Sequence, residues 1–233
     1  MLHYFLGESI LVLGGREEED IGVNPVEIQF NDDGSTVLER CLAEKYERRF
    51  DPVGDFLDGK FVICGGSNYS KIKQDCEVIH ETGIQTFKLI ANGRDEASFV
   101  KLNQSLMWIT GGSVSPTTSL NSTELVTVNG STAGVSLPFT ITRHCMVEYQ
   151  PNIIFLIGGE LNGQYDSKKT WIIDPTNGFN ITEGPTLNQG RMSHSCEKIK
   201  DEYGNVLVIV AGGYKLNSIE VLNITHSSSW FKG

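Results

Sequence analysis

Histidine and cysteine are the residue types with the widest chemistry in this chain, and it contains five of each. The histidines are His3, His80, His144, His194 and His226. The cysteines are Cys41, Cys64, Cys76, Cys145 and Cys196. No Cys-x-x-Cys pair occurs, and no Cys/His spacing matches a zinc site. The Gly-x-Ser-x-Gly elbow of serine hydrolases and the Gly-Lys-Ser/Thr phosphate loop are also absent from the sequence. The motifs therefore predict no catalytic residue, no bound metal and no cofactor.

The composition is that of a folded protein and gives no sign of nucleic-acid or membrane binding. Of the 233 residues, 39% are hydrophobic, which is enough for a core. The formal net charge is −10 and no basic stripe is visible, so a nucleic-acid partner is not expected. No apolar run reaches the roughly 18 residues that a spanning helix needs, so membrane insertion is not expected.

The elements that must position any functional residue come from an internal repeat. Five apolar runs each end in a pair of glycines, and the spacings from first glycine to first glycine are 51, 46, 47 and 54 residues. The pairs are Gly14 and Gly15, Gly65 and Gly66, Gly111 and Gly112, Gly158 and Gly159, and Gly212 and Gly213. Each pair lies between further short apolar or β-branched segments, so each unit is predicted to form four short strands. Glycine is expected at these positions because the chain there adopts a positive φ angle or passes close to another backbone segment.

A four-stranded antiparallel sheet cannot bury both of its faces by itself. Sheets stacked radially cover one another's faces and leave only short edges. The runs before the glycine pairs are almost continuously apolar, which is typical of strands covered on both sides. The pattern therefore favours sheets packed side by side around a common axis.

The last unit resembles a kelch repeat, because its elements follow in the order Gly190–Cys196, Val208–Gly213, Ser218–Leu222 and Trp230. The resemblance implies an all-β, kelch-type β-propeller in a single domain over 1–233. The five four-stranded antiparallel blades would span about 2–43, 44–92, 93–140, 141–189 and 190–233. The first two units match less well, and Asp51–Lys60 is a poor strand by sequence. Kelch propellers usually have six or seven blades, so we expect either a fragment with an incomplete six-bladed ring or a closed ring of five.

Four of the five cysteines form two pairs by their positions in the repeat, and each pair could be a disulfide or two thiols. Cys64 and Cys76 lie on strands that are antiparallel neighbours in a kelch blade, so a disulfide or two buried thiols are both open. Cys145 and Cys196 hold equivalent places in successive blades. Because inner strands of neighbouring blades do not pair, two small buried thiols are favoured there over a bond. Cys41 is left over.

Six Asn-x-Ser/Thr sequons occur, against about two expected by chance. They are Asn68, Asn103, Asn121, Asn129, Asn180 and Asn223. Together with the placement of Cys64 and Cys76, this excess favours a secreted or cell-surface protein, with a cytoplasmic one as the alternative. The segment Met1–Gly15 makes a poor signal peptide, which a fragment would explain.

We therefore expect a non-catalytic scaffold that binds an unknown protein partner, as a glycosylated extracellular module. Loops after the glycine pairs differ in character, as Gly163–Asp166 illustrates, and such loops are expected to bind. Arg143 and Arg191 are the expected partner contacts, because arginine is enriched at interfaces.

Two alternatives remain. One is an intracellular kelch substrate adaptor of a ubiquitin ligase, although nothing here resembles its BTB domain. The other is a kelch-fold enzyme, such as a copper oxidase or a sialic-acid mutarotase. His144 and His194 recur at matched positions and could meet at a metal, but the repeat itself explains their spacing.

Overall fold

The structure is a computed structural model and describes residues 2–5, 9–13, 26–30, 36–41, 49–68, 71–80, 83–89, 92–223 and 229–232. In this part of the chain the fold is all-β, and the one helical element is a single 3-10 turn at Pro175–Asn177. The described strands form five four-stranded antiparallel sheets, numbered first to fifth in chain order. The predicted all-β class with repeated four-stranded antiparallel sheets is confirmed.

The five sheets have the following strands. The first sheet contains β1 (Leu2–Phe5), β2 (Ser9–Leu13), β3 (Val26–Phe30) and β4 (Thr36–Cys41). The second contains β5 (Val53–Leu57), β6 (Lys60–Cys64), β9 (Asp75–His80) and β10 (Gly83–Lys88). The third contains β11 (Ser98–Asn103), β12 (Leu106–Thr110), β15 (Thr123–Thr127) and β16 (Gly130–Ala133). The fourth contains β18 (Cys145–Gln150), β19 (Ile153–Ile157), β21 (Thr170–Asp174) and β22 (Asn180–Glu183). The fifth contains β23 (Ser195–Lys200), β24 (Val206–Ala211), β25 (Ile219–Asn223) and β26 (Phe231–Lys232).

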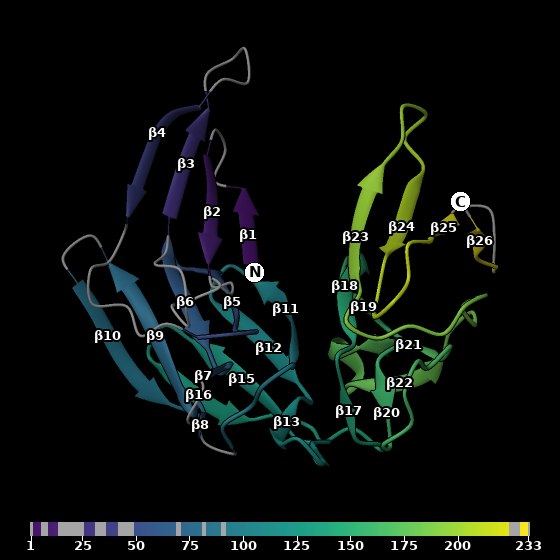
Figure 1. The fold of residues 1–233 in the computed structure, drawn as a ribbon, viewed down its shortest axis with the longest axis horizontal. Coiled ribbons are helices and arrows are strands. Elements are labelled where there is room, and N and C mark those ends of the chain that lie inside the picture. Colours follow the sequence, from purple (N-terminus) through teal and green to yellow (C-terminus); the bar gives the residue numbers. More distant parts are fainter. Residues whose placement is uncertain are drawn as a thin grey trace.

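Three short ribbons lie between these sheets. They are β7 (Ser67–Asn68) with β8 (Lys71–Ile72), β13 (Ser113–Ser115) with β14 (Thr118–Ser119), and β17 (Ile141–Thr142) with β20 (Glu160–Leu161). Within each four-stranded sheet the strands pair in chain order, so each sheet is an up-and-down meander. Figure 1 shows the sheets following one another around an open arc, with the first and fifth sheets at its two ends. The first strands of consecutive sheets, β5, β11, β18 and β23, lie beside one another on the inner side of the arc (Figure 1).

The core lies between the sheets, because alternate residues of one strand face opposite neighbours. On β12, Met107 and Ile109 pack in a cluster with residues of the second sheet. Trp108, between them, packs in another cluster with Leu156 of the fourth sheet. A third cluster joins the fourth and fifth sheets and includes Phe155 and Trp230. Burial on both faces explains why these strands are apolar along their whole length.

The described glycine pairs follow the second strand of their sheets, and all eight glycines have positive φ angles between 57° and 126°. The second glycine of a pair donates its N–H to the next sheet: Gly112 N–H bonds to Ile141 O at 2.9 Å and Gly159 N–H to Arg191 O at 2.8 Å. A Cβ on Gly158 would lie 2.6 Å from Arg191 O. The glycine pairs therefore allow each sheet to dock onto the next. Gly14 and Gly15 lie outside the described residues.

Two disulfides occur among the described residues. Cys64 and Cys76 are bonded across directly paired positions of β6 and β9, with Cα atoms 4.0 Å apart. Cys145 and Cys196 are also bonded, with Cα atoms 6.0 Å apart, which corrects the interpretation of this pair as two thiols. The physical reason is that β18 and β23 share no backbone ladder but lie side by side, so their side chains reach across the gap. The side chain of Cys41 lies outside the described residues.

Candidate functional site

Four equivalent loops lead into the first strands of the second to fifth sheets. At the same place in each loop, two residues before the strand, stand Asp51, Glu96, Arg143 and Ser193. Their φ angles are 44°, 53°, 58° and 52°, in the left-handed region that non-glycine residues seldom adopt. A recurring unfavourable backbone conformation persists only where the surrounding structure holds it, and it often accompanies a functional surface.

Hydrogen bonds between neighbouring loops hold these residues in a row. The N–H of Arg143 donates to Glu96 O, and the N–H of Ser193 donates to Arg143 O, both at 2.9 Å. The hydroxyl of Thr142 also donates to Glu96 O at 3.1 Å. The loops of three consecutive sheets therefore form one continuous rim. The side chains of these loops line the same surface.

A depression of about 620 Å³ lies on this rim, and we call it the rim depression. Its lining residues are Glu96, Arg143, Tyr165, Asp166, Met192, Ser193 and Tyr214. They come from loops of the third, fourth and fifth sheets. The side chains of Tyr165 and Tyr214 are 64% and 55% exposed. Exposed tyrosines around a concave surface are typical of protein-binding sites.

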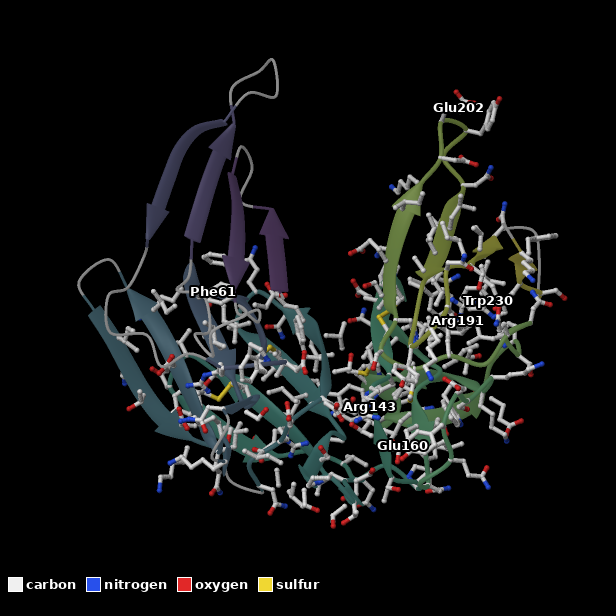
Figure 2. All side chains as sticks on the ribbon, in the orientation of Figure 1. Phe61, Arg143, Glu160, Arg191, Glu202 and Trp230 are labelled. Atoms are coloured by element: carbon white, nitrogen blue, oxygen red, sulfur yellow. A yellow bond between two sulfur atoms is a disulfide. The ribbon has the colours of Figure 1, made fainter. Side chains whose placement is uncertain are left out.

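The charge of Arg143 is already balanced by carboxylates. Its Nε lies 2.8 Å from Glu96 Oε2, and a terminal nitrogen lies 3.7 Å from Glu160 Oε2. Figure 2 labels Arg143 and Glu160 close to each other. Partial burial works against the charged form, but the hydrogen bond to Glu96 and the two negative charges raise the pKa of Arg143. Arg143 therefore stays charged and is held in position.

A second depression of about 320 Å³ adjoins the first and shares Glu96, Arg143 and Ser193 with it. We call it the central depression. Its other lining residues are Asp51, Pro52, Ala97, His144, His194 and Ser195. His144 and His194 are its most buried polar side chains, 6% and 9% exposed. The predicted matching of the two histidines therefore brings them to one surface.

Both histidines are neutral at physiological pH. Burial lowers the pKa of His144 to about 3, and the neighbouring His194 adds to the effect. Burial and the charge of Arg191 lower the pKa of His194 to about 4. No group of three or more His, Cys, Asp or Glu side chains suited to a metal occurs in the described part of the chain. Among the described residues, the histidine pair therefore belongs to no such group of three.

One nitrogen of His144 is anchored and the other is not. Its Nε2 lies 2.7 Å from Thr110 Oγ1, and the Thr110 hydroxyl donates to Met146 Sδ at 3.3 Å. Which of the two groups donates in the His144–Thr110 bond depends on the imidazole tautomer; in the tautomer protonated at Nε2, Thr110 Oγ1 accepts and Nδ1 is an acceptor. This Nδ1 is buried and has no hydrogen-bond partner among the described residues.

The structure corrects the expectation that Arg191 contacts a partner. Arg191 is fully buried, donates to Gly212 O at 2.7 Å and pairs with Glu220 at 2.8 Å. Figure 2 places it inside the fifth sheet, away from Arg143. Sequence reasoning had equated Arg191 with Arg143, but the two stand at different places in the loop. By contrast, the side chain of Arg143 is 30% exposed and lines both depressions.

Sequence reasoning missed a set of buried arginines to which Arg191 belongs. Arg49 and Arg94 occupy the same position, four residues before the first strand, and are also fully buried. Each donates to the carbonyl of the first glycine in its own sheet, Gly65 or Gly111. Their carboxylate partners are Glu77, Glu124 and, for Arg191, Glu220. An arginine before the first strand and a glutamate after the glycine pair recur in these three units. This recurrence in the sequence could have predicted the buried ion pairs.

The asparagines of all six sequons are among the described residues. Four of their asparagines are exposed, namely Asn103, Asn121, Asn129 and Asn180. Asn68 and Asn223 are half-buried. Four sites are thus accessible to a modifying enzyme.

Among the described residues, no helix has the length and apolar character needed to cross a membrane. No protein-family model matches this chain, and a comparison with curated proteins finds no match either.

Proposed function

We propose that this protein is a non-catalytic protein-interaction scaffold of the kelch-type β-propeller class. The five meander sheets around an arc and the glycine pairs at their junctions support the architecture. The observation that carries the function is the rim depression, whose lining comes from loops of three consecutive sheets. Rigid strands hold these loops, and the exposed Tyr165 and Tyr214 supply large contact areas at low entropic cost.

Selection from a random peptide library tests this function. We expect the protein to enrich defined peptides, and the double substitution Tyr165→Ala/Tyr214→Ala to weaken their binding about tenfold or more, because buried aromatic side chains dominate interface energies. Tyr203→Ala is the matched control, since Tyr203 is 81% exposed but lies on the β23–β24 hairpin outside the depression.

Two results would overturn the proposal. One is the absence of any enriched peptide for the folded protein. The other is an equal loss of peptide binding in the Tyr165→Ala/Tyr214→Ala variant and in the Tyr203→Ala control. The rim depression would then have no special part in recognition.

We further propose that the protein is an extracellular glycoprotein. Two disulfides and four exposed sequons support this location. Endoglycosidase treatment of protein secreted from animal cells should increase its gel mobility, and substitution of Asn103, Asn121, Asn129 and Asn180 by Gln should abolish that shift. Unchanged mobility of the wild-type protein would contradict the proposal.

A further inference from the structure

We infer that the partner of this rim presents a basic side chain, a lysine or an arginine, which enters the joined rim and central depressions. The inference rests on the proposed function and specifies the chemistry of its partner. It is carried by three features of the lining: the balance of charge, the exposed aromatic rings, and a buried imidazole acceptor without a partner.

Carboxylates outnumber cations on the lining. Asp51, Glu96 and Asp166 line the two depressions, whereas Arg143 is the one cation among their lining residues. Arg143 is already paired with Glu96 and approached by Glu160, so it has little charge left for an anion. The carboxylates of Asp51 and Asp166 are among the charges that give the whole chain its net charge of −10. The potential of such a concave surface attracts cations.

The aromatic side chains suit the same ligand. Lysine and arginine are attracted to the faces of tyrosine rings within about 6 Å of the centroid. Tyr214 already has such a cation from its own chain, because Lys215 Nζ lies 5.0 Å from the centroid of the Tyr214 ring. The more exposed Tyr165, from the β20–β21 loop of the fourth sheet, is the lining ring that is left for a partner's cation.

The histidine supplies an acceptor in the interior of the surface. His144 lines the central depression and is only 6% exposed. Its buried Nδ1 has no hydrogen-bond partner among the described residues. Because the imidazole is neutral, it does not repel a cation, and in the tautomer protonated at Nε2 its Nδ1 can accept an N–H from an ammonium or guanidinium group. A partner cation would therefore meet carboxylates at the mouth and an acceptor within.

A fluorescent tetra-arginine peptide is the probe for this inference, and the same peptide with citrulline in place of arginine is its neutral control. The variant Asp51→Asn/Asp166→Asn removes two carboxylates of the lining. Asparagine tolerates the left-handed backbone of both positions, where φ is 44° and 53°. The matched control is Glu183→Gln/Glu202→Gln, which removes two exposed charges elsewhere; Figure 2 shows Glu202 at the far tip of the β23–β24 hairpin.

We expect saturable binding of tetra-arginine, no measurable binding of the citrulline peptide, and a loss of about fivefold to tenfold in the Asp51/Asp166 variant. The Glu183/Glu202 variant should change affinity less than about twofold, because distant exposed charges are screened. Binding should also shift the side-chain 15N resonance of His144 Nδ1. Equal losses in both double variants, equal binding of citrulline, or an unmoved His144 resonance would each overturn the inference.

The experiment separates this inference from the proposed function. If library selection yields peptides without basic residues whose binding still depends on Tyr165 and Tyr214, the cationic partner is wrong and the scaffold function stands. If the wild-type protein binds neither library peptides nor tetra-arginine, both proposals fall. The comparison of arginine with citrulline uses the wild-type protein alone, so it holds even if a variant fails to fold.

Discussion

The third and fourth sheets differ at two equivalent interior positions. In the third sheet, Arg94 and Glu124 are both fully buried, with their nearest nitrogen and oxygen atoms 3.5 Å apart. In the fourth sheet these positions carry Ile141 and Trp171, which are 0% and 4% exposed and belong to one apolar cluster. Trp171 also packs against Phe139, with ring centroids 4.4 Å apart.

The backbone around the two positions is the same in both sheets. The carbonyl of Ile141 accepts from Gly112, and that of Arg94 accepts from Gly66, at 2.9 and 2.8 Å. A buried ion pair and an apolar pair thus occupy the same junction. The comparison teaches that the junction needs a matched pair, charged or apolar, rather than an ion pair as such. This agrees with the near balance between desolvation and attraction in buried salt bridges.

The largest effect should follow from breaking the match in the third sheet. Arg94→Met leaves the carboxylate of Glu124 in the interior without its guanidinium, so we expect a loss of about 3–5 kcal/mol in the free energy of unfolding. Urea unfolding followed by fluorescence measures this loss. The double variant Arg94→Met/Glu124→Leu imitates the apolar solution of the fourth sheet and should recover most of it. A double variant no more stable than Arg94→Met would contradict the interpretation.

The feature that both sheets share is the close approach of the first glycine to the next sheet. A Cβ on Gly111 would overlap Ile141 O, and the φ of Gly111 is +57°. We expect Gly111→Ala to lose about 2–5 kcal/mol, from left-handed strain plus overlap. Gly212 has a similar φ of +66°, but its Cβ would be 3.9 Å from the nearest atom, so Gly212→Ala should lose only about 1–2 kcal/mol. Equal losses in urea unfolding would show that backbone strain alone is involved.

The fourth sheet is tied covalently to the fifth, whereas the third sheet has Ser98 at the position of Cys145. We expect Cys145→Ser/Cys196→Ser to lose about 2–4 kcal/mol, mainly because the unfolded chain gains freedom. Cys64→Ser/Cys76→Ser is the comparison variant. Its bond spans 12 residues rather than 51, so the chain-entropy model predicts a smaller loss. If the Cys145→Ser/Cys196→Ser variant is as stable as the wild-type protein in guanidinium unfolding, this disulfide does not contribute the predicted stability.

A smaller effect concerns Asp95, whose equivalent in the fourth sheet is the uncharged Thr142. Burial, together with the negative charges of Asp51 and Glu96, raises the pKa of Asp95 from 3.8 to about 6. A raised carboxyl pKa means that the folded state holds its proton more tightly, so ionisation costs stability as the pH rises from about 4 through 6. Asp95→Asn should therefore stabilise the protein by about 1 kcal/mol near pH 8.

This gain should shrink as the pH falls below about 6, since protonated aspartate and asparagine are then both neutral. Asparagine can keep the hydrogen bond that Asp95 Oδ1 accepts from the N–H of Glu96. Thermal unfolding across the pH range measures the difference. If the difference in stability between the wild-type protein and Asp95→Asn does not vary with pH, the raised pKa of Asp95 is not its cause.

Much of the secondary structure was readable because its signals are local. Glycine pairs after apolar runs identified the second strands of the second to fifth sheets. The interpretation of Asp51–Lys60 as a poor strand was wrong, because β5 forms there. Asp58 and Gly59 adopt positive φ angles that make a tight turn, and Val53 and Leu57 are buried by the neighbouring sheet.

The candidate site was only partly predictable. Arg143 and the loop Gly163–Asp166 were expected at a binding surface, and both Arg143 and Tyr165 line the rim depression. Arg191 was assigned to the same role because its loop looks similar, yet it lies two positions earlier in the loop than the equivalent of Arg143. Only the φ angles and the shared hydrogen bonds reveal which residues correspond.

The sequence by itself determined the repeated strands and the glycine pairs, because hydrophobic alternation and backbone freedom act over a few neighbouring residues. Only the tertiary structure decided the Cys145–Cys196 bond, the buried arginines and the union of Glu96, Arg143 and Ser193 on one rim. Each of these depends on contacts between segments that are distant in the chain. Such contacts are set by how one sheet packs on the next, which no local pattern encodes.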